Sequence, residues 1–307
     1  MRLEGIHHIT AITGDARRNL DFYTRILGLR LVAKTVNQDD PTVYHLFYAD
    51  EHGRAGSDLT FFEYPGAVPG TPGAGMVHTI VSRVAGEASL EFWEERLGAL
   101  EVVAERVDGR LGFADPEGLA HELIVAADGD ELLQARHPDI PAEHALGGFD
   151  GVLAYAEDPE RSRDLLERLM GARAVGDTTW ELRGERRGGT IAFEPAPPGR
   201  ARQSGGSVHH VAFGTTHAEH PAWQQHLAGA GVQVTPVIDR HYFHSIYFRE
   251  PNGVLYEIAD DGPGFAVDVP DEQFGTQIIL PPKFEPDRER IEQILTPLPD
   301  PRAGWDA

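Results

Sequence analysis

The sequence GIHHIT at residues 5–10 returns near the far end of the chain as SVHHVA at residues 207–212. Two weaker versions of this short apolar strand lie between them, GMVHTI at residues 75–80 and GFDGV at residues 148–152. An amphipathic helix pattern follows each of the four, and strand-like runs separated by turn residues follow each helix. The sequence therefore predicts one β-α-β-β-β module repeated four times.

A single module of this kind would leave one face of its sheet exposed, so two modules must share a core. We predict an α+β protein in which four βαβββ modules are paired into two domains with curved mixed β-sheets. The linker at residues 137–144 divides an N-terminal domain, residues 1–136, from a C-terminal domain, residues 145–260. Residues 261–307 do not repeat, and we expect a tail packed across a domain, with disorder beyond Pro297 as the alternative.

The charge of the chain excludes several classes of partner. The 307 residues include 27 Lys and Arg against 49 Asp and Glu, a formal net charge of −22. Such a charge repels phosphate backbones and anionic lipids, so we expect neither nucleic acid nor a membrane as partner. No apolar run approaches the roughly 20 residues of a membrane span, and residues 1–5 do not resemble a signal peptide. These features predict a cytoplasmic protein.

The chain contains no cysteine, which excludes disulfides, thiolate metal sites and cysteine nucleophiles. A bound metal would therefore use mainly His, Asp or Glu. The repeat places histidines on first strands and glutamates on last strands of the modules. The candidate ligands are His8, Glu63, His78, Glu122, His210 and Glu257. Imidazole and carboxylate groups together suit a first-row transition metal.

Two adjacent histidines open both the first and the fourth module. Because strand side chains alternate between two faces, His7 and His8 are not both expected to point inward, nor are His209 and His210. Alignment of the four modules selects His8 and His210, because His78 and Asp150 fall in the same column. It leaves His7 and His209 behind them or pointing outward. Taken singly, each histidine or glutamate fits a structural role equally well. Their recurrence across a duplication favours a metal site.

The chain resembles the vicinal oxygen chelate superfamily, the glyoxalase/bleomycin-resistance/extradiol-dioxygenase group. Within it, the chain is most similar to ring-cleaving dioxygenases of the hydroquinone 1,2-dioxygenase type. The resemblance rests on residues 5–10, on YHLFYAD at 44–50, on VHHVAF at 208–213, and on residues 240–247 leading to PNGVLYE at 251–257. It extends over nearly the whole chain.

This resemblance implies a metal centre between the first and fourth modules, with His8, His210 and Glu257 as ligands. Such a facial triad leaves up to three positions open for substrate oxygen, dioxygen or water. The implied metal is Fe(II), with Mn, Ni or Zn as alternatives, and the implied substrates are dioxygen and a small hydroquinone- or catechol-type aromatic. Tyr247 is assigned to hydrogen bonding or proton transfer at the bound oxygens, and Arg240 to orienting an anionic substrate or the metal-bound carboxylate.

Other interpretations stay open at this stage. Glu63 could add a fourth ligand, as in the glyoxalase-type lyases and isomerases, or the shared cleft could bind an aromatic molecule without metal. A second site could be drawn from His78, Glu122, Asp150 and Glu194, which we interpret as a vestige. For His244, a polar position in a surface loop is the favoured interpretation. The exact aromatic substrate and the oligomeric state, a homo-oligomer included, are not determined.

Overall fold

The computed structural model describes residues 1–127 and 129–305, which form two eight-stranded mixed sheets. Their strand orders are β14-β15-β16-β13-β1-β4-β3-β2 and β10-β11-β12-β9-β5-β8-β7-β6. Each sheet contains two of the predicted βαβββ modules, placed side by side through their first strands. The predicted α+β class with paired modules is confirmed.

The first sheet is built from the outer modules of the chain. The first module contains β1 (Ile6–Thr13), α1 (Ala16–Asp21) with a π-helical turn (Phe22–Ile26), β2 (Arg30–Val36), β3 (Tyr44–Ala49) and β4 (Asp58–Glu63). The fourth contains β13 (Ser207–Thr215), α4 (His220–Gly229), β14 (Ile238–Asp239), β15 (His244–Arg249) and β16 (Leu255–Asp260).

The second sheet is built from the inner modules. The second module contains β5 (Val77–Val84), α2 (Glu87–Ala99), β6 (Ala104–Val107), β7 (Arg110–Ala114) and β8 (Ala120–Val125). The third contains β9 (Phe149–Ala156), α3 (Glu160–Arg163) with a π-helical turn (Asp164–Leu169), β10 (Arg173–Ala174), β11 (Thr179–Arg183) and β12 (Gly188–Pro195).

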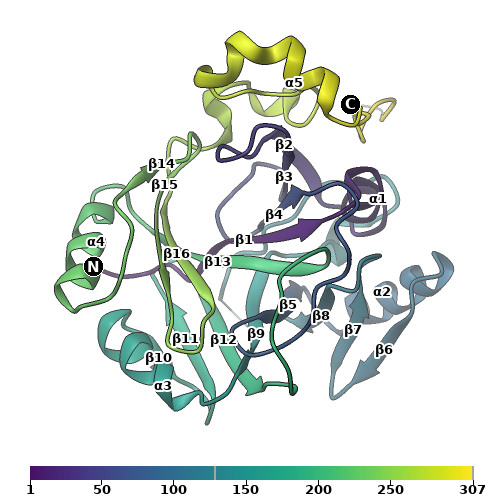
Figure 1. Cartoon of the computed structure of the whole chain (residues 1–307). Coiled ribbons are helices and arrows are strands. Elements are labelled where there is room, and N and C mark those ends of the chain that lie inside the picture. Colours follow the sequence, from purple (N-terminus) through teal and green to yellow (C-terminus); the bar gives the residue numbers. More distant parts are fainter. Residues whose placement is uncertain (128, 306–307) are drawn as a thin grey trace.

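The sheets do not follow the division of the chain at residues 137–144. β1 pairs antiparallel with β13, and β5 pairs antiparallel with β9, so each sheet takes one module from each half of the chain. Figure 1 shows β1 and β13 side by side at the centre of the molecule. All eight residues of β1 are buried, which suits a central strand with neighbours on both sides. The domain limits 1–136, 145–260 and 261–307 stay a prediction, but within the sheets the first module pairs with the fourth and the second with the third.

Paired β-bulges interrupt the central strands of both sheets. In the β1–β13 ladder, the register shifts pass over His7 on one strand and His209 on the other. In the β5–β9 ladder, the equivalent shifts pass over His78 and Asp150. His78 and Asp150 therefore correspond to the bulge residues. The alignment that grouped them with His8 and His210 was wrong by one residue, because it matched His78 and Asp150 to the second histidine of each pair, whereas the strand registers match them to the first.

The helices lie around the outside of the two sheets (Figure 1). The 13-residue helix α2 buries Leu90, Trp93 and Leu97, whose spacing of three and four residues forms one apolar face. No helix within the described residues is long and apolar enough to cross a membrane.

Residues 261–305 continue from β16 over the edge strand β2 and include helix α5 (Arg288–Ile294), at the top of Figure 1. The Ile279 N–H donates to the Lys34 carbonyl oxygen on β2 at 2.9 Å. Beyond Pro297, Arg302 forms two hydrogen bonds to Glu51, of 2.7 and 3.0 Å. The tail is thus packed across the first sheet as predicted. The packing continues beyond Pro297, where the sequence left disorder as an alternative.

The carboxylate of Glu51 anchors this tail, so we expect the anchorage to depend on pH. Burial raises the pKa of Glu51, but bonds from Arg302 and Arg136 outweigh it and lower this pKa from 4.5 to about 2. Because the folded-state pKa lies below the unfolded one, the carboxylate stabilises the fold fully above about pH 5, and this contribution disappears as the pH falls toward 2. Chemical denaturation should show Glu51→Gln to be less stable than wild type at pH 7 and nearly equal to it near pH 2.

The matched control is Glu285→Gln, which removes an exposed carboxylate that pairs with Arg288 inside the tail. Exposed pairs contribute little, so this variant should resemble wild type at every pH. A difference between wild type and Glu51→Gln that does not shrink in acid would contradict the assignment.

Candidate metal centre

Two imidazoles and one carboxylate meet between the outer modules, as the sequence predicted. The Nε2 atoms of His8 and His210 lie 3.2 and 2.9 Å from the same oxygen of Glu257, Oε2, and 3.4 Å from each other. All three side chains are buried. They come from β1, β13 and β16, three adjacent strands of the first sheet. Strand pairing therefore brings together residues that are 202 positions apart.

The carboxylate of Glu257 has the environment expected of a metal ligand. Its side chain is fully buried, yet among the described residues neither oxygen has a hydrogen-bond partner, since the two close histidine nitrogens do not meet hydrogen-bond geometry. Burial raises the pKa of Glu257, but the neighbouring His8 and His210 outweigh it and hold the pKa well below its ordinary value. A buried carboxylate that is ionised and lacks hydrogen bonds is stabilised by a cation. The donor set fits a divalent first-row metal.

The bulges turn both histidines of each pair toward the centre. The Nδ1 atoms of His7 and His8 lie 3.0 Å apart, and those of His209 and His210 lie 2.8 Å apart. His7 is buried and His209 partly buried, so of the two alternatives the contacts agree with a place behind His8 and His210 and not with an outward orientation. Burial lowers the pKa of each of them to about 3, which keeps the rings neutral. A neutral ring can accept the Nδ1–H of its neighbour and so orient the neighbour's Nε2.

A cavity of about 280 Å³ opens beside the triad. Tyr247 and Arg240 both line it, and the Nε–H of Arg240 donates to the Tyr247 hydroxyl oxygen at 3.2 Å. Arg240 is held in turn by Asp39, through a 3.0 Å ion pair. Much of the remaining wall is aromatic, including Phe62 and Phe243. The structure therefore brings both predicted pocket residues to the triad.

The sequence analysis missed His45, which lines the cavity, and Thr60, which lies behind it. The Thr60 hydroxyl contacts Thr10 at 2.8 Å and the His45 ring at 2.9 Å. Thr60 pairs with Thr10 on β1 as Glu257 pairs with Ala212 on β13, so it takes the position that Glu257 takes in the fourth module. A threonine on a strand does not stand out in a sequence as a candidate site residue. The position of Thr60 was recognised only from the strand register.

Glu63 is not a fourth ligand, contrary to the alternative set out above. It lies three residues beyond Thr60 and points to the opposite face of β4, because strand side chains alternate. Its Oε1 accepts the N–H of Ala16 at 3.0 Å and so caps the start of α1. The four-ligand arrangement therefore lacks its expected glutamate.

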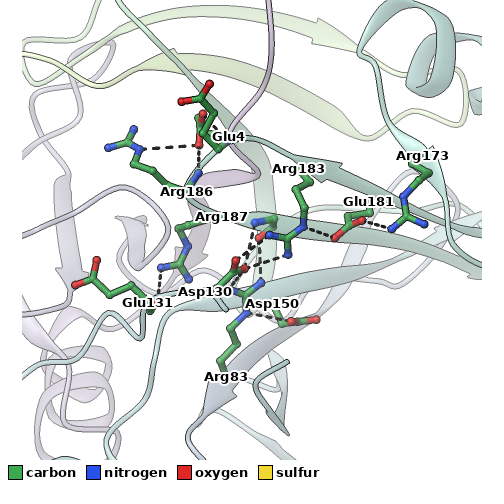
Figure 2. A network of polar contacts seen from close by, with 12 residues as sticks. Glu4, Arg83, Asp130, Glu131, Asp150, Arg173, Glu181, Arg183, Arg186 and Arg187 are labelled. Atoms are coloured by element: carbon green, nitrogen blue, oxygen red, sulfur yellow. Dashed lines mark hydrogen bonds and ion pairs between the residues drawn. The ribbon is translucent and has the colours of Figure 1, made fainter. Parts of the chain in front are cut away.

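The second set of candidates does not form a cluster among the described residues. Glu122 pairs with Arg110 at 2.7 Å, whereas His78 lies 3.4 Å from Glu194. Asp150 pairs with Arg83 at 3.0 Å, within the ion-pair network that Figure 2 shows. The positions equivalent to His8 and His210 are Thr79 and Gly151. Neither residue carries an imidazole or a carboxylate group. The interpretation of this set as a vestige agrees with the geometry.

The family described as the Glyoxalase/Bleomycin resistance protein/Dioxygenase superfamily matches residues 5–123 and 148–258. The chain belongs to this superfamily, which confirms the resemblance noted from the sequence.

Among individual proteins, the chain is 41% identical over 302 residues to MhqO of Bacillus subtilis, provisionally named a ring-cleaving dioxygenase, covering 95% of this chain and 96% of MhqO. It is 31% identical to the chlorohydroquinone/hydroquinone 1,2-dioxygenase of Sphingobium indicum, with 96% of each chain covered.

Among solved structures, a Bacillus subtilis protein provisionally named a dioxygenase matches with a TM-score of 0.92 and 38% identity, over 97% of this chain and 98% of that one. Glyoxalase I from Zea mays matches with a TM-score of 0.57 and 17% identity, over 84% and 92%. This second likeness extends to the fold alone.

Two glutamate variants test the different roles of Glu257 and Glu63. We expect Glu257→Gln to lose tight binding of a divalent metal, because the substitution removes the negative charge from the buried donor set. Glu63→Gln should keep the metal and lose about 0.5–1 kcal/mol of stability, the typical contribution of a carboxylate at a helix N-terminus. Metal content after dialysis and denaturant unfolding measure the two effects. Metal loss in Glu63→Gln would restore Glu63 as a ligand.

Proposed function

We propose that this protein is a ring-cleaving dioxygenase in which His8, His210 and Glu257 hold Fe(II). The substrates are dioxygen and a small hydroquinone- or catechol-type aromatic. The observation that carries the proposal is an open triad, two imidazoles and one carboxylate, beside a cavity with aromatic walls. The names of the relatives described above support the same activity. A donor set of two histidines and one carboxylate, which leaves coordination positions open, is typical of non-haem Fe(II) oxygenases.

Fe(II) at this site would supply open coordination positions for a substrate oxygen and dioxygen, and an electron path between them. Mn, Ni or Zn would suit the same donors. Of these metals, the oxidative chemistry favours a redox-active one.

The role proposed for Tyr247 follows from its hydrogen bonds. Burial raises its pKa, so the phenol stays protonated at neutral pH. Its oxygen accepts a hydrogen bond from Arg240, which leaves its own O–H free to donate into the cavity. Tyr247 would therefore donate its O–H hydrogen bond to an oxygen of the substrate. It would pass that proton to the oxygen and take it back as the ring opens. Arg240 positions Tyr247 and adds a positive charge that favours an anionic substrate.

The cavity sets the size and character of the substrate. An apolar cavity of 150 Å³ holds benzene, so about 280 Å³ holds one aromatic ring with substituents. Phe62, Phe243 and Phe47 provide apolar contact surface for such a ring. His8, His210 and Tyr247 line the same cavity, and a ring hydroxyl would be placed against them. We propose extradiol-type cleavage, at a ring bond next to a hydroxyl-bearing carbon, with both oxygen atoms of dioxygen incorporated.

Reconstitution with Fe(II) under anaerobic conditions, followed by oxygen-electrode measurements, tests the proposal. Oxygen uptake with hydroquinone or catechol, absent in Glu257→Gln, is the expected result. Turnover of methylglyoxal plus glutathione without oxygen, with Ni or Zn, would instead indicate a glyoxalase-type lyase. Aromatic binding that does not depend on metal and leads to no turnover would indicate a binding protein.

Thr60 offers a direct test of the need for an open coordination sphere. Thr60→Glu introduces a carboxylate at the position equivalent to Glu257, where it can supply a fourth donor. We expect this variant to bind metal at least as tightly as wild type and to lose most of its oxygen uptake, about 100-fold or more, because fewer positions stay open. Metal dialysis and the oxygen electrode measure the two properties.

Thr60→Ser, which keeps the hydroxyl bonded to Thr10 and His45, is the matched control and should stay active. If Thr60→Glu retains wild-type oxygen uptake with its metal bound, the open face is not required.

Removal of the Tyr247 hydroxyl should slow the reaction without affecting metal binding. We expect Tyr247→Phe to lower kcat by about 10²- to 10⁴-fold, the usual contribution of a positioned proton donor. Tyr256→Phe is the control, since the buried Tyr256 hydroxyl has no hydrogen-bond partner and does not line the cavity. Steady-state kinetics on metal-loaded protein distinguishes them, and equal kcat values in the two variants would remove Tyr247 from the mechanism.

A further inference from the structure

A second group of two imidazoles and one carboxylate lies at the end of the fourth module, outside the cavity described above. His217 follows β13, His244 begins β15 and Asp260 ends β16. The Nδ1 atoms of His217 and His244 lie 2.6 and 3.0 Å from the same oxygen of Asp260, Oδ2. The two ring centroids are 5.0 Å apart. Three chain segments thus direct one donor atom each toward a common point.

The carboxylate at this point is rigidly held. Its side chain is fully buried, and its second oxygen, Oδ1, accepts the backbone N–H of His244 at 2.8 Å. Among the described residues, neither Lys nor Arg forms an ion pair with Asp260. The negative charge is therefore buried and faced by two imidazoles, without a permanent positive charge to balance it. Such a charge favours a bound cation.

The geometry suits a metal ion in place of the two Nδ1 protons. Metal–nitrogen and metal–oxygen bonds of about 2.0–2.2 Å place neighbouring ligand atoms about 3.0 Å apart at octahedral angles and about 3.4 Å apart at tetrahedral angles. The observed 2.6 and 3.0 Å therefore need to widen only by less than about 1 Å to admit an ion. The His217 side chain is 72% exposed, so it can adjust its position and leave coordination sites for water. Other histidine–aspartate pairs on this protein, such as His52 with Asp271, involve one histidine each. The convergence of a second imidazole distinguishes the group at Asp260.

We propose that His217, His244 and Asp260 form a second metal site, separate from the triad of His8, His210 and Glu257. Imidazole and carboxylate donors bind late first-row divalent ions, and the general order of affinity places Ni²⁺, Cu²⁺ and Zn²⁺ above Fe²⁺. The site therefore takes Zn²⁺ or a similar ion. An ion bound there joins the segment after β13 to the ends of β15 and β16, and so stabilises the fourth module by binding the folded state.

Zn²⁺ stoichiometry in tag-free protein tests this proposal. After equilibrium dialysis, we expect two Zn²⁺ per chain in wild type, one in His217→Ala, one in Glu257→Gln and none in the double variant. The control His52→Ala removes an exposed histidine from an isolated pair and should keep two. Loss of one ligand should weaken the second site by at least about 100-fold, since even partners outside the coordination shell are worth 10- to 100-fold.

Three further measurements separate the two sites. Zn²⁺ should raise the thermal midpoint of Glu257→Gln but not that of the double variant, and it should shift the imidazole ¹⁵N resonances of His217 and His244. Fe(II)-loaded His217→Ala should keep the wild-type oxygen uptake. The proposal is overturned if His217→Ala binds as much Zn²⁺ as wild type, or if Glu257→Gln binds none. Neither result depends on which reaction the first centre catalyses.

Discussion

The pairing of β1 with β13 is the constraint on which the rest of the site depends. It brings the two ends of the chain into one sheet and places His8 and His210 within 3.4 Å of each other. Its two bulges add a residue on each strand, so that His7 and His209 lie beside the cluster rather than on the opposite face. β16 then needs only its parallel register with β13 to bring Glu257 to the same point. Two ladders between three strands thus determine the positions of the donors, without any loop.

The sequence predicted those parts of the site that depend on local pattern and on the repeat. The modules, the two central histidines and Glu257 were all recognisable, because periodicity and residue type are visible in one chain. The orientation of Glu63 was not recognisable. It depends on which residue of β4 pairs with Thr10, and that residue is Thr60, an odd number of positions before Glu63. The bulges could not be predicted either, and the association of the outer modules was implied only by the family resemblance, because both are properties of contacts between distant strands.

The two sheets show how one scaffold can carry a site in one copy and none in the other. The inner sheet keeps the same bulges, but Thr79 and Gly151 stand where the outer sheet has His8 and His210. The bulge residue Asp150 forms an ion pair with Arg83, which also pairs with Asp130. Arg183 forms a further ion pair with Asp130 (Figure 2). Ion pairs between strands and loops there take the place of a metal centre. Bulges alone therefore do not create a site, which also needs donors in the adjacent registers.

The order of the modules along the chain has a consequence for biosynthesis. The inner sheet is complete once residue 195 has left the ribosome, whereas the outer sheet waits for β16 at residues 255–260. Until residues 207–215 have emerged, β1 lacks its neighbour β13 and exposes an unpaired hydrogen-bonding edge, the condition that exposes a nascent chain to aggregation. Any metal centre at Glu257 is therefore assembled last, and a chain that stops short of that residue has a folded half but no place for the cation.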